Sequence, residues 1–314
     1  MKIDVHAHYW TNEYLDLVAG LGKTDTDTQR GLGAGEGDEL VARLHLMDRA
    51  GVDMQILSAC PQMPYSLDRE AAVHVARFVN DQYAAVVKAH PDRFRAFVAT
   101  PMPHVAESIE EIARGLDELG MVGVCVNATI LDQPLIDEAF SPIFAELDRR
   151  GAILYIHPAG NSCCSRLIAD HHLTWQVGAP MEDTISIMQL ITNGIPSRYP
   201  NIRIINSHLG GAMPMLMQRA DNQYGWEAPE TPEKPSLAAK RMWYDTVGHG
   251  HVPALHAAIE TFGADRLVLG TDFPYEAGDI FVRAVRYISD PSIKPADAEM
   301  ILKKNAEGLF GLRK

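Results

Sequence analysis

Two histidines separated by a single residue, His6 and His8, lie near the start of the chain, directly after a short strand-like segment at 3–5. In a strand, alternate side chains point to the same face, so both imidazoles would project in one direction. Imidazole nitrogens are common ligands of zinc and related metals. The spacing therefore predicts half of a divalent metal site, with solvated or core histidines as the alternative.

Three further side chains could complete such a site: His157, His208 and Asp272 each come directly after an apolar, strand-like segment. Because the carboxyl ends of parallel strands open on one face of a barrel, residues far apart in sequence can converge there. Structural or helix-capping roles are the alternatives. Nitrogen ligands with one carboxylate suit zinc or manganese, and we expect one divalent ion, zinc first and manganese second.

Strand-like and helix-like segments alternate along the whole chain. The candidate strands are 3–5, 52–58, 94–99, 122–126, 152–156, 202–206, 242–247 and 267–269. The candidate helices are 39–50, 69–90, 105–119, 136–150, 181–195, 212–222, 253–262 and 279–288. This alternation predicts parallel strands joined by helices, and at 314 residues it favours one (β/α)8 TIM-barrel domain over residues 1–314. A doubly wound open sheet is the alternative, but no glycine-rich G-x-G-x-x-G motif follows the first strand.

Three segments interrupt the alternation, and we expect them to form long loops over the active face, near 9–37, 158–179 and 223–239. They contain or adjoin side chains that could bind a substrate. Trp175 could stack on a planar molecule, and Arg30 could clamp a carboxylate. Arg219 lies about three helical turns beyond His208, so it could reach the pocket of a neighbouring subunit. A surface charge is the alternative for both arginines.

Composition excludes several classes of partner. A formal charge of −13 makes nucleic acid and anionic membranes unfavourable partners, since both are polyanions. The sequence contains no apolar run long enough for a membrane span, and the first strand begins where a signal peptide would stand. The four cysteines form neither a disulfide framework nor a C-x-x-C zinc motif. We therefore expect a cytoplasmic protein whose partner is a small molecule.

Seven segments along the chain form a set of motifs: MKIDVHAH at 1–8, HP at 157–158, WQVGAPMEDT at 175–184, HLGG at 208–211, YDTV at 244–247, GTDFP at 270–274 and NAEGLF at 305–310. Together they resemble the aminocarboxymuconate-semialdehyde decarboxylase branch of the amidohydrolase superfamily. The fourth candidate strand carries no lysine that could bridge two ions, which favours a mononuclear centre. Ala159 stands where the muconate-semialdehyde enzymes carry an aromatic residue, and Arg30 is the only equivalent of one of their carboxylate-binding arginines.

The resemblance implies a role for each candidate. The metal ligands would be His6, His8, His157 and Asp272. His208 would be the catalytic histidine beside the metal, with Asp272 as a second catalytic group; Trp175 would line the pocket, and Arg219 would bind a substrate carboxylate across a homodimer interface.

The function that follows is metal-dependent, non-oxidative decarboxylation of a small aromatic or unsaturated carboxylic acid. A metal beside the substrate could absorb the negative charge that develops during decarboxylation. The alternative is a hydrolase or hydratase of the same superfamily that attacks a C–C, C–O or C–N bond with activated water. A non-catalytic binding protein is a third hypothesis, but every expected ligand position carries a competent side chain.

Overall fold

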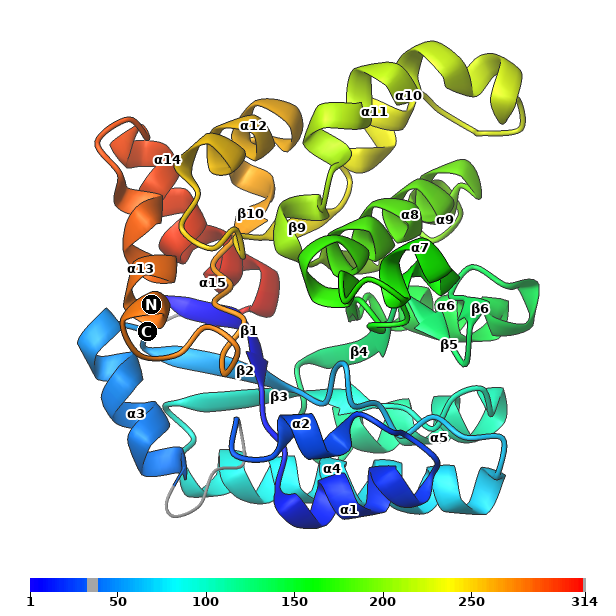
Figure 1. Ribbon diagram of the computed structural model, residues 1–314, viewed down its shortest axis with the longest axis vertical. Coiled ribbons are helices and arrows are strands. Elements are labelled where there is room, and N and C mark those ends of the chain that lie inside the picture. The colour runs from blue at the N-terminus through cyan, green and yellow to red at the C-terminus, as the bar shows by residue number, and fades with distance from the viewer. Residues whose placement is uncertain (33–38, 313–314) are drawn as a thin grey trace.

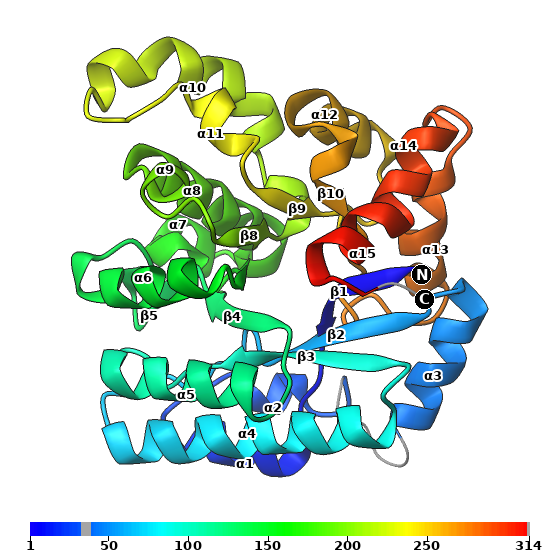
Figure 2. The ribbon, with the colours of Figure 1, turned by 180° about the vertical axis from the view of Figure 1, so that it is seen from behind.

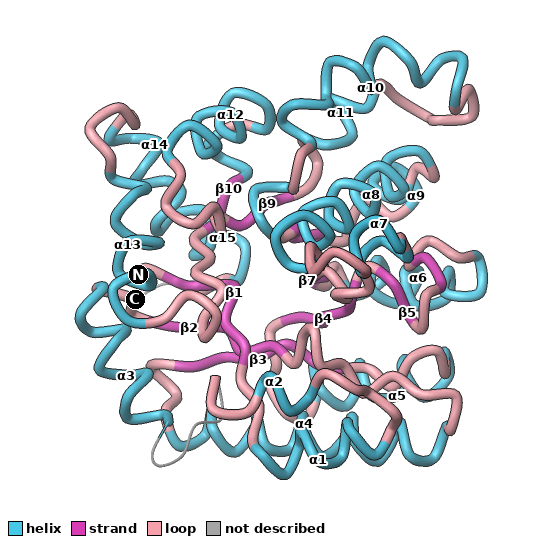
Figure 3. Tube along the Cα trace, in the orientation of Figure 1, coloured by secondary structure: helices cyan, strands magenta, loops and turns pink. Residues whose placement is uncertain are grey.

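The computed structural model describes residues 1–32 and 39–312, which form a barrel of parallel strands surrounded by helices (Figures 1 and 3). The barrel strands are β1 Ile3–His8, β2 Met54–Ser58, β3 Phe94–Ala99, β4 Gly123–Asn127, β7 Ile153–His157, β8 Arg203–Asn206, β9 Trp243–Asp245 and β10 Leu267–Val268. They are hydrogen-bonded in the order β1-β2-β3-β4-β7-β8-β9-β10, and every neighbouring pair is parallel. The prediction of eight parallel strands is therefore confirmed.

The main helices lie outside the strands, as the view from behind also shows (Figure 2). They are α3 Glu39–Ala50, α4 Arg69–Ala89, α5 Val105–Asp117, α6 Ser141–Arg150, α8 Ala179–Thr192, α10 Met213–Glu227, α12 Val252–Phe262 and α13 Gly278–Arg286. Most begin and end within a few residues of the predicted bounds, because their buried apolar side chains recur at helical spacing. A capping residue fixes the start of α4: the Asp68 carboxylate accepts a hydrogen bond from the Ala71 N–H.

Shorter elements complete the described chain. The short α-helices are α1 Asn12–Gly20, α2 Thr26–Gln29, α7 Arg166–Ala169, α9 Ile195–Arg198, α11 Pro235–Ala239, α14 Pro295–Glu299 and α15 Asn305–Phe310. The 3₁₀ or π turns are η1 Glu138–Phe140, η2 Ser162–Cys164, η3 Thr174–Gly178, η4 His208–Gly210, η5 Ala264–Arg266, η6 Tyr287–Ser289 and η7 Met300–Lys304. A small antiparallel hairpin joins β5 Thr129–Ile130 to β6 Gln133–Pro134. In the described part of the chain, none of the helices combines the length and apolar character that a membrane span requires.

The three segments expected to be loops differ from that expectation, because each contains helical turns. The segment 9–37 includes α1 and α2, and its residues 33–37 lie outside the described residues. The first of these helices forms because Thr11 caps it and because Tyr14, Leu15 and Val18 bury one face. The segment 158–179 includes η2, α7, all of η3 and the first residue of α8, and 223–239 includes the end of α10 and all of α11.

The first strand is longer than the predicted range 3–5, since β1 continues through both histidines to His8. It closes the barrel against the chain around β10: the Val5 N–H donates to the Leu269 carbonyl at 2.9 Å, and the His8 N–H donates to the Phe273 carbonyl at 2.7 Å. This closure places the first and last strands side by side, and the two chain ends lie close together (Figure 1).

Asp4 ties the closure together from inside the barrel. Its carboxylate is fully buried and accepts hydrogen bonds from the Thr271 hydroxyl at 2.6 Å, the Thr271 N–H at 3.0 Å and the Gln55 amide at 2.8 Å. A buried carboxylate is stable only when its oxygens are hydrogen-bonded. Asp4 therefore links β1 to β2 and to the chain after β10.

We expect Thr271→Val to lower the free energy of unfolding of the metal-free protein by about 1–3 kcal/mol, because the buried Asp4 carboxylate loses its hydroxyl donor. Urea denaturation followed by circular dichroism measures the loss. The control is Thr28→Val, which removes an exposed hydroxyl bonded to the Asp25 carbonyl. An equal loss in both variants would contradict the role of Asp4 in closure.

Candidate metal centre and active site

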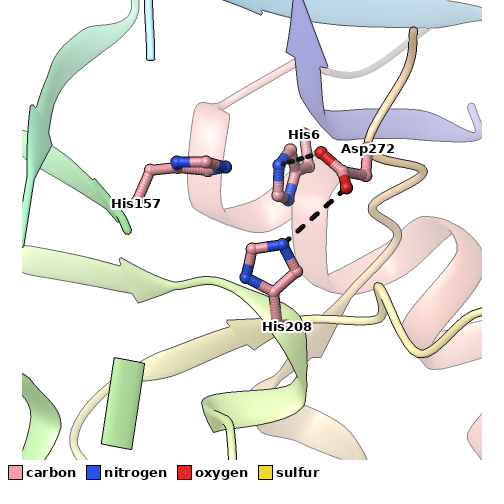
Figure 4. Close-up of side chains that lie close together, drawn as sticks. All are labelled: His6, His157, His208 and Asp272. Carbon is pink, nitrogen blue, oxygen red and sulfur yellow. Dashed lines mark ion pairs between the residues drawn. The ribbon is translucent and has the colours of Figure 1, made fainter. Parts of the chain in front are cut away.

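Four side chains from distant parts of the sequence meet at the carboxyl ends of the strands (Figure 4). They are His6 on β1, His157 at the end of β7, His208 directly after β8, and Asp272 after β10. Each offers one ligand atom, and these four atoms lie within 4.8 Å of one another. The convergence expected from the strand ends is therefore present in the fold.

His8 adds a fifth group to this cluster. Its Nε2 lies 3.1 Å from the Nε2 of His6 and 3.1 Å from the Asp272 Oδ1, and the same carboxylate oxygen lies 3.0 Å from the His6 Nε2. Two ligands about 2.1 Å from one ion and at right angles to each other would be roughly 3.0 Å apart. These atoms therefore have the mutual spacing of ligands around a single ion.

His157 supplies independent support for a metal. Its Nε2 is buried and has no hydrogen-bond partner among the described residues, although buried polar atoms are nearly always satisfied. Its Nδ1 lies 2.8 Å from the Pro158 carbonyl, so that nitrogen carries the proton and Nε2 keeps its lone pair. An unpaired nitrogen lone pair beside two other imidazoles and a carboxylate fits a divalent cation.

The outer nitrogens of His6 and His8 are also fixed. The Nδ1 of His6 lies 2.7 Å from the Asp245 carboxylate, and that of His8 lies 2.9 Å from the Ser58 hydroxyl. Partners of this kind hold the ring orientation and tautomer of metal-binding histidines. Gly270 allows this packing, since a Cβ there would lie 2.8 Å from the Asp245 Cβ and 3.0 Å from the His6 Cβ.

The charges of the cluster are unbalanced in the metal-free state. Burial lowers the pKa of His6, but the carboxylates of Asp245 and Asp272 outweigh it and raise that pKa to about 9. Burial lowers the pKa of His8 to about 4 and holds the pKa of His157 well below its usual value. Burial would raise the pKa of Asp272, yet the neighbouring histidines hold it well below its usual range. The metal-free centre thus holds an ionised carboxylate beside the neutral imidazoles of His8 and His157, whereas His6 carries a proton that a bound cation would displace.

His208 faces the same carboxylate from another side. Its Nδ1 lies 2.8 Å from the Asp183 carboxylate, and its Nε2 lies 3.8 Å from the Asp272 Oδ2. Burial lowers the pKa of His208, but Asp183 and then Asp272 raise it well above its usual value. The Ser207 hydroxyl donates to Asp183 at 2.8 Å and holds that carboxylate in place. His208 therefore has the arrangement of an acid–base histidine oriented by a carboxylate.

A cavity of about 600 Å³ opens beside His157, His208 and Asp272. Most of its wall is apolar, and the chain after β8 and the start of α12 supply much of it: Leu209, Ala212, Pro214, Met215, Pro253, Ala254 and Ala257. Trp175 lines it as well, and its ring stacks on Tyr275 with centroids 6.2 Å apart and planes 30° apart. A cavity of this size fits a small planar molecule.

The two arginines lie elsewhere in this chain. Arg30 contacts Asp16 at 2.6 Å and Asp27 at 3.0 Å and is not among the cavity-lining residues. Arg219 is exposed on α10 and is also not among the residues that line the cavity. The structure therefore brings together the histidines, Asp272 and Trp175, and leaves both arginines outside this chain's own cavity.

Sequence reasoning missed the carboxylates that orient the histidines. Asp245 and Asp183 occur within the motifs that carry the family resemblance, but neither was assigned a role. Asp245 is the last residue of β9, and its position at a strand end could have identified it as a candidate site residue. Asp183 lies on α8 and had no such signal, because its contact with His208 joins two elements whose packing only the fold defines.

The comparisons with known proteins identify the family of this chain. A family model described as amidohydrolase matches residues 3–312, so the chain belongs to the amidohydrolase family. The chain is 31% identical to gamma-resorcylate decarboxylase of Rhizobium sp. over 86% of both chains. It is also 29% identical to 2-amino-3-carboxymuconate-6-semialdehyde decarboxylase of Dictyostelium discoideum, over 86% of this chain and 76% of that protein.

Solved structures are similar over the whole chain. A 2,6-dihydroxybenzoate decarboxylase bound to 2,6-dihydroxybenzoate is 28% identical, with a TM-score of 0.85 and 99% of both chains covered. A dihydroxybenzoic acid decarboxylase of Polaromonas sp. JS666, with bound manganese and the inhibitor 2-nitroresorcinol, is 28% identical with a TM-score of 0.84; 100% of this chain and 97% of that chain are covered.

We expect Asp245→Asn to weaken binding of one divalent ion per chain by about 10–100-fold, because the amide holds the His6 ring less firmly. Competition with a chromogenic chelator measures the affinity, and elemental analysis measures the stoichiometry. The matched control is Asp183→Asn, which disturbs His208 and should leave metal affinity unchanged. Equal loss in both variants would identify His208 as a ligand, and two ions per chain would contradict a mononuclear centre.

Proposed function

We propose that this protein is a metal-dependent decarboxylase that removes the carboxylate of a small aromatic acid without oxidation. The observation that carries the proposal is the position of a convergent histidine–carboxylate cluster at the side of an apolar cavity sized for one aromatic ring. The similarity to decarboxylases of gamma-resorcylate and 2,6-dihydroxybenzoate supports the same substrate class.

In this proposal, His6, His8, His157 and Asp272 hold one divalent ion. The spacing of about 3.0 Å between three of their ligand atoms and the unpaired Nε2 of His157 support that set over one that includes His208. Three imidazoles and one carboxylate favour zinc, and manganese is the alternative. The bound ion would supply positive charge that stabilises electrons accumulating on the substrate.

We assign the proton transfers to His208 and Asp272. Decarboxylation adds a proton to the ring carbon that carries the carboxylate; the C–C bond electrons then return to the ring, and CO₂ leaves. His208 carries a proton at neutral pH because Asp183 stabilises its charged form, and its Nε2 faces the Asp272 Oδ2. We propose that Asp272 relays this proton from His208 to carbon.

The remaining substrate contacts are also proposals. Trp175 would pack on the ring of the substrate, since it lines the cavity and is already stacked on Tyr275. We propose that Arg219 serves a partner subunit in a homodimer. It lies on α10, which projects from the barrel (Figure 1) and also exposes Met215 and Trp226 at 86% and 71%. Arg30 would reach a substrate only if it left Asp16 and Asp27.

The isotope content of the product tests the reaction type. We expect the metal-loaded protein in D₂O to release CO₂ from 2-hydroxybenzoate-type acids and to leave deuterium at the former carboxyl position, with no ¹⁸O from labelled water. Mass spectrometry of the product measures both isotopes. Stoichiometric ¹⁸O in a new hydroxyl or carboxyl group without CO₂ would instead establish the hydrolase or hydratase alternative.

Substitution of His208 tests its assignment. We expect His208→Ala to retain the metal and to lower turnover by about 10²–10⁴-fold, the range of a general acid–base contribution. Elemental analysis and initial rates of CO₂ release measure the two effects. A variant that purifies without metal would make His208 a ligand, and unchanged turnover would remove it from the reaction.

A further inference from the structure

A histidine in the wall of the cavity is paired with a buried carboxylate, and neither residue belongs to the metal cluster. His249 follows β9 and lines the cavity, and its Nδ1 lies 3.0 Å from the Oε1 of Glu276. Most of the surrounding wall is apolar, and none of the described lining residues is a lysine or an arginine. A polar pair in an apolar cavity fixes the orientation of a bound molecule more than its affinity.

Glu276 is buried without adequate partners. Its side chain is 2% exposed, and neither carboxylate oxygen has a well-aligned hydrogen-bond donor among the described residues. The contact with His249 is short in distance but too bent to count as a hydrogen bond. Catalytic and binding contacts are often misaligned without a ligand and tighten when one binds. A small rotation of the His249 ring would therefore satisfy Glu276.

The backbone holds His249 in an uncommon conformation. Its φ is +51°, in the left-handed region, and Gly250 follows with φ +73°. A Cβ at Gly250 would lie 3.0 Å from the Arg283 side chain, and one at Gly248 would lie 2.7 Å from Leu209. The turn is thus packed closely on both sides of His249. A strained conformation of this kind persists where the surrounding structure enforces it, often at ligand sites.

The pairing determines what His249 can bind. When Nδ1–H is donated to the Glu276 carboxylate, the neutral ring keeps an acceptor lone pair on Nε2. The His249 side chain is 73% exposed and lines the cavity, so a bound molecule can reach the ring. A ring hydroxyl or amino group can donate to Nε2, whereas a second carboxylate would find no lysine or arginine among the described lining residues.

Resting on the proposed decarboxylase, we propose that His249, oriented by Glu276, recognises a hydroxyl or amino substituent on the ring of the substrate. The preferred substrate class is then an aromatic monocarboxylic acid that carries this further polar substituent. His249 touches the substrate, and Glu276 is a positioning residue that acts through it.

The test uses probes that bind but cannot lose CO₂. Titration calorimetry of the metal-loaded protein compares 2-nitrophenol with nitrophenols that carry one further ring hydroxyl. We expect at least one hydroxylated probe to bind about tenfold more tightly than 2-nitrophenol, the effect of one hydrogen bond. His249→Asn should abolish this preference, and asparagine tolerates the left-handed backbone at this position. Its matched control, His251→Asn, changes another cavity-lining histidine and should keep the preference.

Glu276→Gln separates positioning from a structural role. This variant should reduce the preference for hydroxylated probes while leaving affinity for 2-nitrophenol and the thermal unfolding midpoint unchanged. An unchanged preference in His249→Asn, an equal loss in His251→Asn, or no preference in the wild-type protein would overturn the inference. If the preference depends on His249 but no aromatic acid releases CO₂, the recognition role stands and the proposed reaction fails.

Discussion

The closure of the barrel between β1 and the chain after β10 is the interaction on which the candidate site depends. The Asp272 N–H donates to the His6 carbonyl at 2.9 Å, so the backbone that completes the barrel also places a carboxylate beside two imidazoles. Asp272 adopts a left-handed φ of +57°, which turns its side chain as β10 ends. The contacts that close the barrel therefore also assemble the cluster. Asp4 stabilises both, because it accepts hydrogen bonds from Thr271.

A second constraint comes from burying several titratable groups together. His6, His8 and His157 share a small buried volume with Asp272, and their pKa values move in opposite directions because burial and the nearby carboxylates compete. Without an ion, one proton and several lone pairs compete for the same space. A divalent cation stabilises this arrangement, since it accepts the lone pairs and neutralises the carboxylate.

Apart from His157, His208 and Asp272, the residues that line the cavity lie outside the cluster. The strands hold the histidines rigidly, whereas the chain after β8 and β9 and the turns at 158–179 shape the space for a substrate. This division is typical of TIM barrels: the strands form the same framework in different enzymes, and the segments that follow the strands determine the chemistry of each active site. His249 and Glu276 both lie in segments of this kind, after β9 and β10.

The sequence alone determined the elements and the identity of the convergent residues. Apolar periodicity predicted eight strands and the main helices, and histidines at strand ends predicted His6, His8, His157 and His208 as neighbours. Local patterns could not predict the pairing of His6 with Asp245 or of His208 with Asp183, nor that Arg30 contacts surface carboxylates. These contacts join residues far apart in the chain, and their geometry exists only after the barrel closes. Periodicity is a property of neighbouring residues, whereas hydrogen-bond partners and cavity shape depend on how distant elements pack.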